Sequence, residues 1–198
     1  MTTPTPQPER LPLDDYLPEY DLTQIQHKVV DAPTDAAYDR LRHLDFMSSA
    51  LVRGLTAAQA TPERVARRIR RLPPKPPYPR HATLDDMLGP NGWVLLGDQP
   101  GREVVLGLLW PFRQAVPRVP EVTPEQWVAF GEPGYAKVAW SLSARSYGTG
   151  RTLLTSEART LCTDPATARR FRLLWRGLGP FAALLKWRML DMAAGNAS

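Results

Sequence analysis

The sequence predicts an α+β fold in which a curved antiparallel sheet is closed by a long C-terminal helix. The first observation is an alternation over residues 135–146, which has the period of a half-buried strand. One face of this strand carries Ala136, Val138, Trp140, Leu142 and Ala144. A second strand follows the turn at 148–150. Asp164 and Pro165 then open a helix, because Asp is a favoured N-cap and Pro fits the first helical position. A sheet and a helix arranged in this way can enclose an apolar pocket.

The composition is that of one globular domain. The chain has 198 residues, 43% hydrophobic and 23% charged, so it is long enough to bury a sizeable core. We expect residues 1–12, rich in Thr, Pro and Gln, to form a flexible arm and residues 13–193 to form the domain. The one cysteine, Cys162, excludes an intramolecular disulfide and suits a reducing cytoplasm. We expect no signal peptide, because the start MTTPTPQPER lacks an apolar core, and no apolar run approaches the ~18 residues that a membrane span needs.

The first half of the chain is expected to supply one strand and several helices. In order, we predict a strand over 22–31, helices over 33–44, 48–58 and 62–72, a stiff proline-rich connector over 73–79, and a short helix capped by Thr83 and Asp86. Tyr38 belongs to the apolar stripe of the first helix. In the third helix Val65, Ile69 and Leu72 form the predicted inner stripe.

A cluster of arginines lies on that third helix. Arg64, Arg67, Arg68 and Arg71 are spaced so that they share one face. Four like charges repel one another, so an anionic partner such as nucleic acid or an anionic membrane would relieve the repulsion. The alternative is an ordinary solvated face that pairs with acidic side chains elsewhere. The net charge of +5 and the pI near 9.7 permit both interpretations.

The second half is expected to add the rest of the sheet. A hairpin is predicted over 92–112, and its second strand is so apolar that both of its faces should be covered. Gly107 inside that strand indicates a bulge or the close approach of another element. A loop over 113–124 and a short strand over 125–131 should follow. The C-terminal helix should kink or break at Pro180, because proline removes a backbone donor.

The register of the last hairpin decides which side chains face inward. A three-residue loop fits a type I turn with a glycine bulge, and it places Trp140 near Ala158. A two-residue loop would instead place Trp140 beside Glu157 and bring an acid and a base into the pocket. We prefer the first register because it keeps one face apolar or small on both strands. Trp140 should then contact Phe171 or Trp175 of the terminal helix.

Several stretches along the chain carry a family resemblance: LPEYDL, GWVLLGDQPGREVVLGLLW, FGEPGYAKVAWSLSA, GTGRTLLTSEARTLCTDPATARRFRLLW and GPFAALLKWRML. Together, over about residues 17–192, they resemble bacterial members of the SRPBCC superfamily, the START-like or helix-grip proteins. The resemblance implies a strand, two helices, a run of antiparallel strands and a long C-terminal helix gripped by the sheet. It also implies hydrophobic ligand binding, transport, or cyclase or hydrolase activity, with no catalytic residue shared across the superfamily. The family pattern Thr-Glu-Thr-Arg is matched by Glu157 and Arg159, and only in part by Ser156 and Ala158.

No established catalytic or metal motif is present, so no catalytic residue is assigned. His27, His43 and His81 lack metal-ligand spacing. The candidates for ligand binding are aromatic residues that can line a pocket, with one acid and one base from the last hairpin. They are Tyr38, Trp93, Trp110, Trp140, Glu157, Arg159, Phe171 and Trp175. The alternatives are that the aromatic residues fill a solid core and that Glu157 and Arg159 form a surface ion pair.

The sequence favours a protein that binds or carries a small hydrophobic molecule without a cofactor, as a monomer or homodimer. One alternative is an enzyme of the cyclase or hydrolase type that uses Glu157 and Arg159 in the pocket. Another is an interaction module whose Arg64–Arg71 face binds nucleic acid or anionic lipid. The volume of the space between the sheet and the last helix separates the first hypothesis from a filled core.

Overall fold

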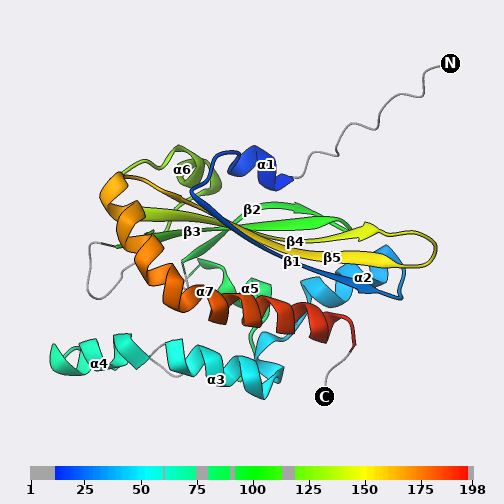
Figure 1. Cartoon of the computed structure of the whole chain (residues 1–198), viewed down its shortest axis with the longest axis horizontal. Helices are drawn as coiled ribbons and strands as arrows, with labels where there is room; N and C mark the ends of the chain where they lie inside the picture. The colour runs from blue at the N-terminus through cyan, green and yellow to red at the C-terminus, as the bar shows by residue number, and fades with distance from the viewer. Residues whose placement is uncertain (1–11, 60, 75–79, 90–91, 113–118, 196–198) are drawn as a thin grey trace.

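A computed structural model of the chain describes residues 12–59, 61–74, 80–89, 92–112 and 119–195. Its elements are α1 (Pro12–Tyr16), β1 (Leu22–Val30), α2 (Thr34–Arg42), the 3-10 turn η1 (Phe46–Ser48), α3 (Ala50–Gln59), α4 (Thr61–Ile69), α5 (Leu84–Met87), β2 (Trp93–Gln99), β3 (Glu103–Pro111), α6 (Pro124–Ala129), β4 (Tyr135–Ser146), β5 (Thr152–Cys162) and α7 (Pro165–Ala193). The predicted fold class is confirmed, because a curved five-stranded antiparallel sheet lies against the 29-residue α7 in a helix-grip arrangement (Figure 1).

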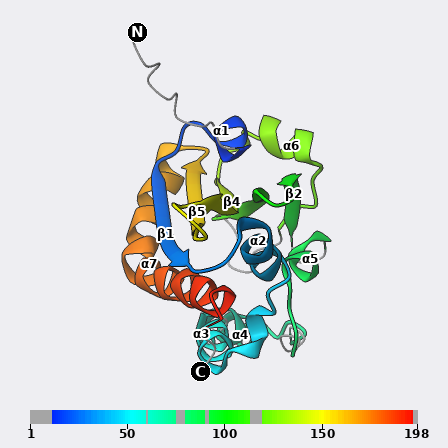
Figure 2. The ribbon, with the colours of Figure 1, turned by 90° about the vertical axis from the view of Figure 1, so that its right-hand side faces the viewer.

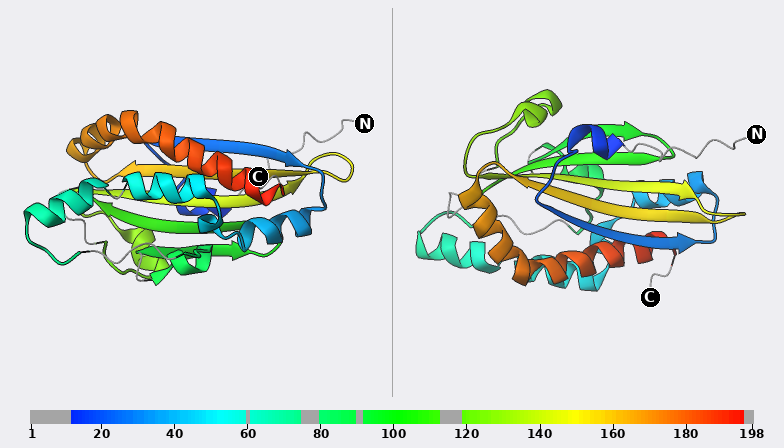
Figure 3. Two further views of the ribbon diagram at one scale, coloured as in Figure 1. Left: turned by 90° about the horizontal axis from the view of Figure 1, so that it is seen from below. Right: turned by 45° about the horizontal axis from the view of Figure 1, so that its top comes forward.

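The sheet has two covered faces. Its strands are ordered β1-β5-β4-β3-β2, so the hairpins β2–β3 and β4–β5 lie side by side and β1 pairs with the outer edge of β5. Side chains alternate along each strand, which sends neighbours to opposite faces. α7 lies across one face, and α1 and α6 lie on the other (Figures 1 and 2). α3 contacts α7 on the side away from the sheet, and α4 continues outward from α3 (Figures 1 and 3).

The preferred register of the last hairpin is confirmed. Trp140 pairs with Ala158, as the three-residue loop requires. The Tyr147 N–H donates to the Arg151 carbonyl at 2.9 Å and closes that loop. Both loop glycines, at 148 and 150, have positive φ, a conformation that glycine adopts without a steric cost. The face that carries Trp140 is the face that α7 covers, since Trp140 and residues of α7 line one space.

Strand β3 is covered on both faces, as predicted. Every residue of β3 except Trp110 is buried. Gly107 marks a close approach rather than a bulge in its own strand: a Cβ there would stand 2.9 Å from the Trp127 ring. Trp127 belongs to α6 and is fully buried, so the missing side chain makes room for that helix.

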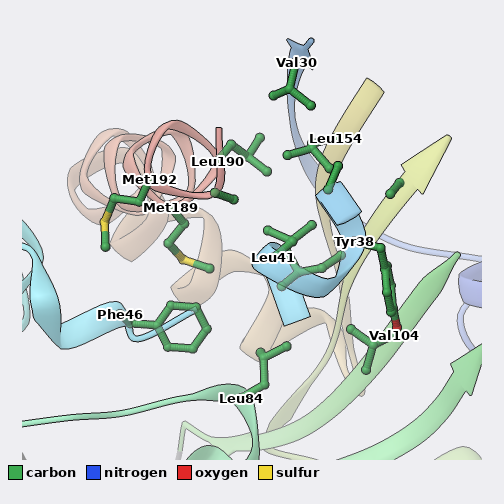
Figure 4. Close-up of a cluster of buried hydrophobic side chains, with 14 of the residues drawn as sticks. Val30, Tyr38, Leu41, Phe46, Leu84, Val104, Leu154, Met189, Leu190 and Met192 are labelled. Carbon is green, nitrogen blue, oxygen red and sulfur yellow. The ribbon is translucent and has the colours of Figure 1, made fainter. Parts of the chain in front are cut away.

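One end of the space between α7 and the sheet is filled by a hydrophobic cluster. Figure 4 shows Met189, Leu190 and Met192 of α7 gathered with Tyr38 and Leu41 of α2. The side chains drawn with them come from η1, from α5 and from the strands: Phe46, Leu84, Val30, Val104 and Leu154. The cluster thereby anchors the C-terminal end of α7.

The predicted strand over 125–131 is wrong. Residues Pro124–Ala129 form α6, which Thr123 caps by accepting the Gln126 N–H at 3.3 Å while the Gln126 side chain accepts the Thr123 N–H at 2.8 Å. A Thr-Pro pair followed by Gln is a helix-start signal that outweighs the apolar spacing of the short segment.

The predicted inner stripe of α4 is wrong, and the predicted kink of α7 is confirmed. The stripe Val65, Ile69 and Leu72 was expected to face inward, yet all three side chains are exposed, because α4 packs on α3 and does not reach the core. Pro180 kinks α7 without breaking it: the helix is continuous, and its ribbon bends near the middle (Figures 1 and 3). Three predicted segments lie partly outside the described residues. They are the N-terminal arm at 1–11, the proline-rich connector at 75–79 and the loop at 113–118.

Candidate functional site

A cavity of about 470 Å³ lies between the sheet and α7. Ligand pockets commonly have volumes of about 300–1,000 Å³. The strands supply its floor with Leu22, Trp93, Leu108, Trp110, Val138, Trp140, Ala158 and Thr160, joined by Phe112 directly after β3 and Met87 of α5. The helix α7 supplies Phe171, Leu174, Trp175, Leu178, Ala182, Leu185, Lys186 and Met189. The space that could have held a solid core is therefore open, and its lining is almost entirely apolar.

Five of the eight predicted site residues line this cavity. They are Trp93, Trp110, Trp140, Phe171 and Trp175. The strand alternation places the first three on the face toward α7, and helical spacing places the other two on the side of α7 toward the sheet. That they contact a ligand stays a prediction.

Trp140 stands where the cavity meets the hydrophobic cluster. Its indole N–H donates to the Ser156 hydroxyl at 2.9 Å, so the polar atom of the ring is satisfied within the sheet. Its ring neighbours are Trp93, with centroids 5.8 Å apart, and Phe46, at 6.3 Å. The expected partners on α7 line the same cavity but pair with each other: the rings of Phe171 and Trp175 stack with centroids 5.3 Å apart.

The cavity opens beside the first half of α7. Among its lining residues, Trp110 is 40% exposed, Leu174 43% and Leu178 36%. Exposed aromatic and aliphatic side chains at the rim of an apolar cavity offer a path for an apolar molecule to enter.

Sequence reasoning missed Lys186, the one charged side chain among the described residues that line the cavity. Its ammonium donates to the Gln24 side-chain carbonyl of β1 at 2.9 Å. Burial lowers the pKa of Lys186 to about 8, since the apolar surroundings disfavour the charged form. The signal was present in the helical spacing, because Lys186 follows Trp175, Leu178 and Ala182 along one side of α7.

Tyr38 lies outside the cavity lining. It belongs to the filled cluster, and its hydroxyl donates to Asp98 of β2 at 2.9 Å. Burial, with the hydrogen bond to Asp98, raises the pKa of Tyr38 well above its usual range. The contribution of Tyr38 is thus to join α2 to the sheet.

Glu157 and Arg159 lie on the opposite face of the sheet from the cavity. They form the expected ion pair, with Arg159 Nε 2.7 Å from Glu157 Oε1, but the pair is buried rather than at the surface. Arg159 also contacts Asp14 at 2.7 Å and donates to the Leu17 carbonyl at 3.1 Å. The pair therefore holds α1 and the residues after it against the sheet, and the pocket position that the enzyme hypothesis required is wrong.

A second buried acid, Glu103, lies on that same face. Its side chain is fully buried, and neither carboxylate oxygen has a hydrogen-bond partner of ordinary geometry among the described residues. Desolvation raises the pKa of Glu103, although Ser141 and the Leu13 backbone lie close enough to oppose the shift. Nothing in the spacing of the sequence distinguishes Glu103 from an ordinary exposed acid at the end of a turn.

Nucleophilic and metal chemistry find little support in the described part of the chain. Burial raises the pKa of the Cys162 thiol to about 12, which disfavours the reactive thiolate. The described residues contain no group of three or more His, Cys, Asp or Glu side chains able to hold a metal ion. Within the same residues, no helix is both long and apolar enough to cross a membrane.

No protein-family model matches the sequence, and no curated protein matches it. Among solved structures, the crystal structure of CalU16 from Micromonospora echinospora is 15% identical, with a TM-score of 0.26 over 88% of this chain and 84% of that chain. A TM-score this low carries no weight for fold or function, so both rest on the geometry described above.

Proposed function

We propose that this protein binds or carries a small hydrophobic molecule in the cavity between the sheet and α7, as a member of the SRPBCC superfamily and without a cofactor. The observation that supports this proposal is the cavity itself, about 470 Å³ of apolar space in a position where a core would otherwise be filled. Burying an apolar ligand there removes its surface and the facing aromatic surface from water, which favours binding.

The enzyme hypothesis has weaker support. It relied on Glu157 and Arg159 in the pocket, yet both lie on the other face of the sheet, where they pair with each other and Arg159 also contacts Asp14 of α1. The polar side-chain groups left in the cavity lining are those of Thr160, Lys186 and the indoles. These groups suit the orientation of a ligand better than an acid–base pair, which needs two titratable groups near the reacting atoms.

A cavity-filling variant tests the proposal. Ala182 of α7 lines the cavity, whereas Leu184, two residues later, is 39% exposed. Nile red, a neutral apolar dye, is expected to bind the wild-type protein saturably at one site. Ala182→Phe should weaken this binding by about tenfold or more, because the new ring occupies the ligand space.

Leu184→Phe is the matched control, since it adds a ring to the outer side of the same helix. It should leave dye binding unchanged, and the melting temperature of each variant shows that it folds. Failure of the dye to bind saturably, or equal binding by Ala182→Phe and wild type, would refute the proposed function.

A second candidate function is supported by α4. Arg64 and Arg68 are exposed on this helix, and so are the apolar side chains of Val65 and Ile69. A short helix that presents both cations and apolar side chains suits the surface of an anionic membrane better than nucleic acid, because lipid can accept the apolar side chains as well. This interaction would be compatible with ligand binding in the cavity.

A further inference from the structure

Among the described residues that line the cavity, Lys186 carries the single amino group, and its position limits what the ligand can be. We propose that the ligand is an apolar molecule with one carboxylate, and that the Lys186 ammonium binds this carboxylate. This inference rests on the proposed function and adds the chemical class of the ligand.

The ammonium is held in place by a chain of hydrogen bonds between β1 and α7. The Gln24 amide N–H donates to the Gly179 carbonyl at 2.9 Å, which orients the amide so that its oxygen accepts from Lys186 at 2.9 Å. Gly179 directly precedes Pro180, the residue at the bend of α7. A lysine ammonium has three N–H donors, and Gln24 accepts one of them. The amino group is thus oriented, with donors remaining for a ligand.

Lys186 differs from its charged neighbours in having no acidic partner in the described part of the chain. The carboxylate of Asp191, one turn and a half further along α7, is engaged by Lys28 and by Arg188. Lys186 is half-buried among apolar side chains, and a cation withdrawn from water in this way is costly unless an anion accompanies it. A ligand carboxylate would supply that anion.

The single ammonium selects against other polar end groups on the ligand. An amine would be repelled by Lys186. A phosphate carries more charge than one ammonium neutralises, and sites for it use several cations or backbone donors. A monocarboxylate matches one ammonium, and its tail matches the surrounding aromatic and aliphatic side chains.

Competition between matched ligands tests the inference. Decanoate and 1-decanol have the same tail and differ in their end group. Each is titrated into the protein with bound Nile red near neutral pH, and the ratio of the two dissociation constants is measured. The wild-type protein should prefer decanoate by about tenfold or more, as expected for a charge-assisted hydrogen bond in an apolar site. Lys186→Met keeps a long side chain without the charge. It should abolish this preference, so that the ratio of the two dissociation constants is about one.

Lys28→Met is the matched control. Lys28 contacts α7 from β1 as well, but it pairs with Asp191 and is absent from the cavity lining. This variant should keep the preference for decanoate. Equal affinity for the acid and the alcohol in wild type, or a preference that survives in Lys186→Met, would overturn the inference and leave the proposed function standing. If neither compound displaces the dye and the dye itself does not bind, the proposed function fails as well.

Discussion

Substitution of Trp140 can show whether this side chain forms a wall of a binding site or fills the core. It is buried, and it lines the cavity on one side while contacting Phe46 on the other. Truncation of a Trp in a filled core costs about 3–5 kcal/mol. We expect Trp140→Ala to cost less, about 2–3 kcal/mol, because part of its surroundings is already open. Chemical unfolding measures the cost, and Nile red binding should weaken at the same time.

Trp127 supplies the comparison for this prediction. It is fully buried on the other face of the sheet, against Gly107, and has no contact with the cavity. Trp127→Ala should show the full loss of about 3–5 kcal/mol with unchanged dye affinity in the folded protein. Equal stability losses in the two variants, with dye binding intact in both, would mean that Trp140 fills core and forms no wall of a binding site.

At the scale of elements, α1 depends on one buried arginine. Arg159 contacts Glu157, Asp14 and the Leu17 carbonyl, so its removal leaves a buried carboxylate unpaired. We expect Arg159→Met to lower the free energy of unfolding by about 3–5 kcal/mol. Hydrogen exchange should show loss of protection in the segment from α1 to β1. The double variant Glu157→Gln with Arg159→Met should regain part of the stability, because it leaves no buried charge.

The exposed α4 is the element that a membrane surface would contact. The double variant Arg64→Glu with Arg68→Glu should weaken binding to vesicles containing phosphatidylserine by about tenfold or more, since each basic residue near such a surface contributes about 1 kcal/mol. Ile69→Asp should also weaken it, through loss of the apolar contact. Co-sedimentation measures both effects.

Added salt distinguishes the possible partners of α4. Vesicle binding should fall as ionic strength rises, because counterions screen the arginines. Binding that is insensitive to salt would contradict the electrostatic explanation. If Ile69→Asp had no effect while duplex DNA bound as tightly as the vesicles, the partner would instead be a phosphate backbone.

At the scale of the whole molecule, Lys186 couples stability to pH. Its pKa falls from an ordinary 10.5 to about 8 on folding, so between these values the unfolded chain binds more protons than the native protein. Stability from this group therefore rises as pH increases through that window, by about 1–3 kcal/mol. Lys186→Met should be the more stable protein at pH 7, with an advantage that shrinks toward pH 10.

Wild type and Lys186→Met must be compared directly, because Tyr38, Cys162 and Lys137 also titrate at alkaline pH with shifted pKa values. Their contributions cancel in the difference between wild type and variant. Urea unfolding at several pH values provides the measurement. A difference that stays constant from pH 7 to pH 10 would show that the Lys186 ammonium is well solvated.

Local patterns in the sequence were enough to predict the order of most elements and the inward face of the last hairpin. The alternation around Trp140, the glycines of the loop after β4 and the Asp164-Pro165 helix start each depend on residues close together in the chain. Five of the aromatic residues that line the cavity follow from these patterns, because a strand or helix face is a local property. The short α6 was missed where a capping signal and the apolar spacing disagreed.

Only the tertiary structure decided what lies beneath each face. Glu157 and Arg159 share a strand face in any fold, but the position of α1 makes that face a buried ion-pair site away from the cavity. Lys186 is held in the lining by Gln24 on the polar side of β1, which hydrogen-bonds both to Lys186 and to the Gly179 carbonyl beside the bend at Pro180. The cavity is the space left between the facing surfaces of the sheet and α7, which come together only on folding. Its volume depends on the distance between sheet and helix, which no local pattern specifies.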